Sequence, residues 1–331
     1  MVWVIFLVAA LAIVLASTVL VRDADVIADR TGLGHVWIGA LLLAAVTSLP
    51  ELVTGSAAVL RDAPELGTGS LFGSNMANMA ILGLLGLVYA RHRVIQREAP
   101  GLALTAIMAI VVTGLASLFI ALRLEIDVGW LSIGTLALVA ALLAYALLIR
   151  GHQETTARPD ATPLATVAQA EGPSLGIAAG RFAAAALVVL AVGPFLVSSA
   201  EEIAELTGVS ETFFGVLGLA AATSLPELAT TASALRIGAI NLAVGNLYGS
   251  NVANMAILAW LDVIHVEGPL LESIDLSNSV AGMVAVLLMT VGLVAMATRA
   301  KRSRLPFDPA AAVIVIGYVL GLLLVWGVSG R

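Results

Sequence analysis

The chain alternates long apolar runs with short polar breaks from one end to the other. A run of about 20 apolar residues is the length that a helix needs to cross the hydrocarbon core of a bilayer. Ten runs are predicted to span a membrane: residues 2–21, 36–60, 65–90, 101–121, 129–149, 178–198, 212–235, 240–261, 278–298 and 309–328. The pattern therefore predicts an all-α integral membrane protein with ten transmembrane helices.

Composition and charge agree with this prediction. Of the 331 residues, 60% are hydrophobic and 11% are charged, which is far from the composition of a soluble domain. Thirteen of the 16 basic residues lie in the odd-numbered connections between spans. Because cytoplasmic loops carry the excess of Lys and Arg, these connections are predicted to be cytoplasmic and both termini external. The opposite connections are acidic, as at Asp262 and Glu267, which indicates either solvated loop ends or a field that gathers cations.

The sequence contains an internal duplication. Residues 44–82 align without a gap to residues 220–258, at an offset of 176, and 23 of the 39 aligned positions are identical. "TSLPEL" occurs in both copies, and "GSNMANMAIL" returns as "GSNVANMAIL". The repeat predicts a first five-helix unit at 1–149, a cytoplasmic linker at 150–177 and a second five-helix unit at 178–331. Since five is odd, the second unit must enter the membrane from the opposite side, which predicts two inverted repeats with a substrate site between them near the bilayer midplane.

Each copy places a glutamate in the middle of an apolar run, at Glu51 and Glu227. An ionisable residue at that depth costs at least a few kcal/mol and usually serves function. Inverted symmetry is expected to bring the two together with these oxygen donors: Thr47, Ser48, Ser74, Asn78, Thr223, Ser224, Ser250 and Asn254. An all-oxygen set suits a hard cation such as Ca2+ or Na+, and the chain contains no cysteine that could favour a softer metal.

Proline and glycine accompany these residues. Pro50 and Pro226 lack an N–H and are expected to free carbonyls one turn earlier, near Thr47 and Thr223. Four glycines are expected to let helices approach closely: Gly69, Gly73, Gly245 and Gly249. Kinks and packing alone remain an alternative for the prolines and glycines, but they do not explain two midspan acids.

The paired "TSLPEL" and "GSNxAN" segments in a duplicated ten-span chain resemble the cation/calcium antiporter superfamily, and most of all its prokaryotic sodium/calcium exchanger branch. The resemblance implies a compact ion-holding core across which the first and sixth helices slide, in the cell membrane of a prokaryote. It also implies that Ca2+ binds the carboxylates of Glu51 and Glu227 and the main-chain carbonyls of Thr47 and Thr223. Sodium would use the serine hydroxyls and the carbonyls of Ala44 and Ala220, with Asn78 and Asn254 as the central polar pair.

One departure from the family pattern concerns charge. Many relatives carry aspartate at a central position, whereas this chain has asparagine at both Asn78 and Asn254. Asparagine cannot ionise, so the site is expected to hold a charge of −2 rather than −3.

The leading hypothesis is secondary antiport of Na+ against Ca2+ by alternating access, without a cofactor, with the ions and the bilayer as partners. An antiporter of the same fold that couples Ca2+ or another cation to H+ or K+ is the alternative. A cation channel or a binding sensor with this fold is a third hypothesis. An enzyme is not expected, because no nucleophile, base and electrophile are visible together. No nucleic-acid partner is expected either, and the chain is taken to function as a monomer.

Overall fold

The computed structural model describes residues 1–31, 44–89, 100–124, 126–156, 173–236, 239–298 and 308–329. The helices of the first repeat are α1 (Val2–Thr31), α3 (Leu49–Leu60), α4 (Pro64–Val88), α5 (Pro100–Leu122) and α6 (Ile133–Thr156). Residues 44–47, just before α3, are also helical. A short antiparallel hairpin of β1 (Asp127–Val128) and β2 (Leu131–Ser132) leads into α6.

The second repeat has the same order of elements. It begins with α7 (Leu175–Thr207) and continues through a broken segment of α8 (Glu211–Phe214), the π-helical turn η4 (Gly215–Leu219), α9 (Ala220–Thr223) and α10 (Leu225–Arg236). It then runs through α11 (Ile240–Ile264), the single turn α12 (Leu270–Ser273), α13 (Leu276–Thr298) and α14 (Pro309–Ser329).

These elements account for the predicted spans. Among the described residues, seven helices are long and apolar enough to cross a membrane, namely α1, α4, α5, α7, α11, α13 and α14. The bent segment from Glu211 to Arg236, with a 45° angle at its break, is an eighth. The shorter apolar helices Leu49–Leu60 and Ile133–Ile149 stand at the two remaining positions, although residues 32–43 of the predicted 36–60 span lie outside the described part. The protein is thus an all-α membrane protein with the ten-helix inverted-repeat fold.

Three helices extend beyond their predicted spans. The first, fifth and sixth spans were predicted at 2–21, 129–149 and 178–198, whereas α1, α6 and α7 continue for about two to three further turns, to Thr31, Thr156 and Thr207. The apolar run marks only the part of a helix that lies in lipid, whereas helical hydrogen bonding extends into polar sequence until a stop signal occurs. For α7 that signal is Gly208, which adopts the left-handed conformation (φ 68°) at the C-terminal cap.

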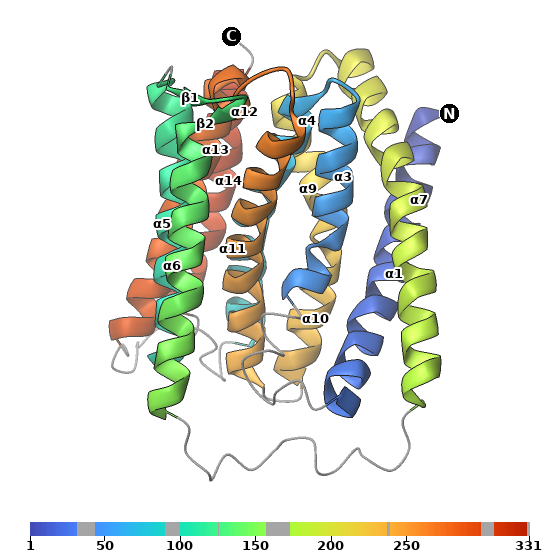
Figure 1. Ribbon diagram of the computed structural model, residues 1–331, viewed down its shortest axis with the longest axis vertical. Coiled ribbons are helices and arrows are strands. Elements are labelled where there is room, and N and C mark those ends of the chain that lie inside the picture. The colour runs from blue at the N-terminus through green and yellow to red at the C-terminus, as the bar shows by residue number, and fades with distance from the viewer. Residues whose placement is uncertain are drawn as a thin grey trace.

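The arrangement agrees with an even number of crossings. Figure 1 shows the start of α1 and the end of α14 on the same side of the molecule, with α1 and α7 packed against each other at one edge. The side on which the termini lie in the cell remains a prediction, as do the limits of the three predicted regions. Of the predicted linker, residues 157–172 lie outside the described part.

Helices of the two repeats interlock rather than form separate bodies. The helix α4 packs against α13 and α14 of the second repeat, and its counterpart α11 packs against α5 and α6 of the first. Both helices are central, with Phe72 and Tyr248 fully buried at equivalent positions. Because each of these contacts recurs with the repeats exchanged, the two repeats pack in the same way around a shared centre.

Asp262, near the C-terminal end of α11, ties two of the connections between helices together. It was expected among the solvated acidic loop ends, but it is fully buried. Its carboxylate accepts hydrogen bonds from the backbone N–H of Ser132 at 3.1 Å and of Leu270 at 2.6 Å, and so joins the β-hairpin to α12.

Asp262→Ala is expected to destabilise the protein, because it leaves two buried N–H groups without an acceptor, at about 1–3 kcal/mol each. Asp262→Asn keeps one acceptor and should lose less. The measurement is the thermal midpoint of the purified protein in detergent, with exposed Glu267→Gln as the control. Equal midpoints for Asp262→Ala and Glu267→Gln would contradict the bracing role.

Candidate functional site

The site is built on two helix breaks that have the same geometry. Helical residues 44–47 end at Ser48 (φ −86°, ψ 6°), and α9 ends at Ser224 (φ −86°, ψ 4°). A proline at the second position of the following helix, Pro50 or Pro226, cannot donate the hydrogen bond that would continue the helix. The duplicated sequence therefore folds twice into the same interruption.

Each break leaves carbonyl groups without helical partners. Around the first break, Ser48 N–H donates to Ala44 O at 3.0 Å and Leu52 N–H to Ser48 O at 3.0 Å. Across the part of the chain that is described, no backbone hydrogen bond of this kind bridges the break to Thr47 O, and the same holds for Thr223 O. A carbonyl exposed by a broken membrane helix is tolerated where it lines a cavity or a ligand site.

The two glutamates lie in the first turn of the helices that follow the breaks. Glu51 in α3 and Glu227 in α10 are each 1% exposed. The N-terminal end of a helix carries partial positive charge, which favours a carboxylate there. The two carboxylates are close enough to interact electrostatically, so a cation between them would relieve the repulsion of two buried negative charges.

Hydroxyl groups from both repeats surround each carboxylate. Ser74 donates to Glu51 Oε1 at 3.3 Å, and Glu51 also faces Thr223 and Ser224 of the second repeat. Glu227 faces Thr47 and Ser250 in the corresponding way. The inverted repeat thus supplies each acid with donors from both halves of the chain.

The hydroxyl groups are also bonded to one another. Ser224 donates to Ser74 Oγ at 3.0 Å, and the hydroxyls of Thr47 and Ser250 lie 3.2 Å apart. These two links join the broken segments to α4 and α11. The geometry brings together the glutamates, serines and threonines predicted from sequence.

Asn78 and Asn254 lie in the middle of α4 and α11 and are each 1% exposed. Asn78 Nδ2 donates to Asn251 Oδ1 at 2.9 Å, and Asn254 Nδ2 donates to Asn75 Oδ1 at 3.0 Å. The partners Asn75 and Asn251 were missed in the sequence analysis. The signal was available, since both belong to the duplicated "GSN" and precede the predicted asparagines by three residues, which places each pair on one helix face.

Several buried oxygens at this centre have no hydrogen-bond partner among the described residues. They are Ser48 Oγ, Glu51 Oε2, Glu227 Oε2, Asn78 Oδ1 and Asn254 Oδ1. Buried polar atoms are normally satisfied, so a cluster of unsatisfied ones requires an explanation. The amide nitrogen Asn251 Nδ2 is also unpartnered in the described structure, but these five atoms are oxygens, which are the ligands that hard cations take in proteins.

The carbonyls of Ala44 and Ala220 are in a different position from this cluster. Ala44 O accepts the N–H of Ser48 and, at 3.1 Å, the hydroxyl of Thr47. Ala220 O accepts the N–H of Ser224 at 2.9 Å and lies 3.4 Å from the hydroxyl of Thr223. Their use as sodium ligands, predicted from the family resemblance, stays a prediction and would require these hydroxyls to turn away.

Two of the four glycines have the expected role. A Cβ on Gly69 would lie 2.7 Å from Thr212 O, and one on Gly73 would lie 2.4 Å from Val216 O and 2.8 Å from Ala220 Cβ. The absence of a side chain lets α4 touch the backbone of the broken segment. Gly245 has only Leu102 Cδ2 at 3.0 Å from such an atom, and the expectation for Gly249 stays a prediction.

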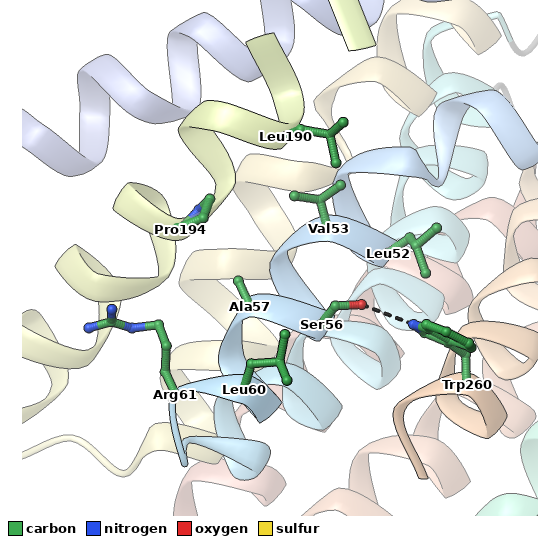
Figure 2. Close-up of a pocket in the computed structure, with 9 residues that line it drawn as sticks. All are labelled: Leu52, Val53, Ser56, Ala57, Leu60, Arg61, Leu190, Pro194 and Trp260. Carbon is green, nitrogen blue, oxygen red and sulfur yellow. Dashed lines mark hydrogen bonds between the residues drawn. The ribbon is translucent and has the colours of Figure 1, made fainter. Parts of the chain in front are cut away.

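An apolar cavity of about 700 Å³ lies near the site but is distinct from it. Figure 2 shows it between α3, α7 and α11, with Arg61 at one end and the indole N–H of Trp260 donating to Ser56 Oγ at 3.2 Å. The cavity uses the face of α3 that carries Leu52 and Val53, whereas Glu51 belongs to the opposite, buried face. This cavity therefore does not contain the oxygen cluster.

A helix break in each inverted repeat, with paired acids and hydroxyls at the repeat interface, defines a multi-pass membrane transporter with a cation site. The chain belongs to the sodium/calcium exchanger protein family, which matches residues 1–150 and 177–327. The family consists of transporters, not enzymes, and the chain is a cation/calcium exchanger of this fold.

Individual relatives agree with this assignment. The chain is 29% identical over 343 residues to the inner membrane protein YrbG of Escherichia coli K12, covering 98% of this chain and 97% of YrbG. It is 31% identical over 266 residues to CaxA of Alkalimonas amylolytica, which is 75% of either chain. Among solved structures, the H+/Ca2+ exchanger CAX superposes with a TM-score of 0.67 at 15% identity, covering 99% of this chain and 88% of that one.

Proposed function

We propose that the protein exchanges Na+ for Ca2+ across the cell membrane of a prokaryote, with both ions using the buried pair Glu51 and Glu227. The observation that carries the proposal is the cluster of unsatisfied buried oxygens around two carboxylates at the repeat interface. Two negative charges neutralise one Ca2+, and oxygen ligands suit both Ca2+ and Na+. The ions bind as substrates, and the proposal includes no cofactor.

The ligand roles follow from the donors that each break supplies. Ca2+ would bind the two carboxylates and the carbonyls of Thr47 and Thr223, which have no helical partner. The serine hydroxyls at Ser48, Ser74, Ser224 and Ser250 would complete sodium sites on either side. The amide oxygens of Asn78 and Asn254 would lie between them as neutral donors.

Transport requires that the site open to the two sides in turn. The helices α1 and α7 pack mainly on each other at the edge of the molecule, whereas α4 and α11 are interlocked with the other repeat. We therefore assign the movement to α1 and α7, across a static core. Ca2+ would be expelled from the cell as Na+ enters down its gradient.

The alternative is coupling to H+ or K+ with the same site. Carboxylates can carry protons as well as metal ions, and CAX, whose fold is similar, is an H+/Ca2+ exchanger. The serine hydroxyls beside each glutamate support Na+, since a proton carrier needs only the carboxylates.

The test is calcium uptake into liposomes that contain the purified protein. Vesicles loaded with Na+ and diluted into Na+-free buffer are expected to take up radioactive calcium, and vesicles loaded with choline at the same pH are not. Uptake driven instead by an imposed pH or K+ gradient, without any response to Na+, would assign the protein to the alternative. Flux that neither saturates nor is stimulated by calcium on the opposite side would indicate a channel.

A further inference from the structure

The charge of the candidate ion site can be counted from the structure. Over the described residues, the other buried acids are engaged elsewhere. Asp23 lies 3.1 Å from Arg181, Asp262 accepts two backbone N–H groups, Asp308 accepts the N–H of Ala310, and Glu65 accepts Thr212 and Asn278 in the first turn of α4. No group of three acidic or histidine side chains in this part of the chain is arranged to hold a metal ion. Among the described residues, the site therefore has two carboxylates and no third ionisable group.

The central positions are held as neutral amides by their own hydrogen bonds. Asn78 and Asn254 each use Nδ2 to bond an asparagine on the opposite helix. This leaves both Oδ1 atoms unpartnered. An amide fixed in this way offers an oxygen to a cation but adds no charge to the site.

From these two observations we propose that the exchange is electroneutral, with one Ca2+ moving against two Na+, and that Asn78 and Asn254 determine this ratio. The inference rests on the proposed sodium/calcium exchange. An uncompensated charge in the low-dielectric centre of a membrane protein is strongly disfavoured. Two carboxylates are neutralised by one Ca2+ or by two Na+, whereas a third Na+ would leave a net positive charge as the site crosses the membrane.

Electroneutral exchange predicts that the final Ca2+ ratio across the membrane does not depend on the membrane potential. A potential of 100 mV acting on one net charge would change the equilibrium ratio of internal to external Ca2+ by about 50-fold. An exchanger that moves no net charge shows no change at all. The two outcomes are thus far apart.

Positions 78 and 254 differ in how well they would accept an aspartate, which would be the third carboxylate of the site. An aspartate at position 78 or 254 loses the donor to the facing asparagine oxygen. Asn251 can turn its amide, because its Nδ2 has no partner in the described structure. Asn75 cannot turn without breaking its bond to Thr113 Oγ1 at 3.1 Å. Asn78→Asp is therefore the variant expected to fold, and Asn254→Asp the one expected to be less stable.

The experiment uses the full chain in liposomes loaded with Na+, with the potential clamped at 0 or −100 mV by valinomycin and K+. Initial rates and final ratios of radioactive calcium are recorded, together with the ratio of sodium to calcium fluxes. The wild type is expected to show the same final ratio at both potentials, and a flux ratio of two. Asn78→Asp is expected to make the final ratio potential-dependent, with a flux ratio that moves toward three, because three Na+ neutralise three carboxylates whereas one Ca2+ leaves a net charge of −1. That uncompensated charge should also lower the initial rate of exchange.

Each result decides the inference. Na+-driven uptake in the wild type that responds about 50-fold to 100 mV, or a flux ratio of three, would overturn electroneutrality and leave the proposed exchange intact. An unchanged, voltage-independent Asn78→Asp would overturn the role of the asparagines. Absence of Na+-driven uptake would contradict the proposed function and this inference with it. If Asn78→Asp does not fold, the wild-type flux ratio still decides electroneutrality, and Asn254→Asp, assayed in the same way, decides the role of the asparagines.

Discussion

Replacing Glu51 with glutamine is expected to reduce Na+-dependent Ca2+ uptake by about 100-fold or more, the effect of losing one charge contact at this depth. Glutamine keeps the size of the side chain and can still bond to Ser74, so the local packing is retained. The variant lacks the second negative charge that Ca2+ needs. By the inverted symmetry, Glu227→Gln is expected to have the same effect.

A stability measurement separates this effect from misfolding. Without cations, the two buried carboxylates repel each other, so removal of one charge is expected to leave the thermal midpoint unchanged or to raise it. Added Ca2+ is expected to raise the midpoint of the wild type but not of Glu51→Gln. The matched control is Glu205→Gln, which changes an exposed acid of α7 and should leave uptake and midpoint unchanged. Normal uptake by Glu51→Gln, or loss of uptake by Glu205→Gln, would contradict the assignment of the site.

Gly73→Ala is expected to cause the largest loss that involves no change of charge. The added Cβ would lie 2.4 Å from Val216 O and 2.8 Å from Ala220 Cβ, and backbone atoms cannot move aside as side chains do. Overpacking of this kind costs about 1–3 kcal/mol. It would also separate α4 from the broken segment, whose Ser224 hydroxyl is 3.0 Å from Ser74 Oγ. We therefore expect both a lower thermal midpoint and loss of uptake.

The control for this variant is Gly180→Ala in α7, where nothing lies within 4 Å of the added atom. Alanine is favoured over glycine in a helix interior by about 0.5–1 kcal/mol, so this variant should fold at least as well as the wild type and retain uptake. A Gly73→Ala protein with a normal midpoint and normal exchange would show that α4 and the broken segment do not need this contact.

Much of this protein could be predicted from local sequence because a membrane imposes strong rules. A helix must be about 20 apolar residues long to cross the bilayer, so the spans could be counted from the sequence. An ionisable side chain inside such a span is costly, so Glu51 and Glu227 could be identified as candidate functional residues. The prolines indicated breaks that the structure places at Ser48 and Ser224. The length of α7 was underestimated because the polar sequence after its apolar run is equally able to form a helix.

The partners of the central asparagines could not be predicted in the same way. Asn75 and Asn251 are as strongly duplicated as Asn78 and Asn254, but repetition does not indicate which amide bonds which. That depends on how α4 and α11 cross, which is set by contacts with the other repeat. Asp262 was misjudged for the same reason, since its two N–H partners, Ser132 and Leu270, lie in different connections.

The sequence by itself determined the number of spans, the duplication and the two midspan acids, because each follows from hydrophobicity or identity along one segment. Only the tertiary structure decided which oxygens are left without partners, which amides are tied across the repeats and which face of α3 is apolar. These properties arise from contacts between residues that are more than 100 positions apart, and the sequence carries no local signal for such contacts.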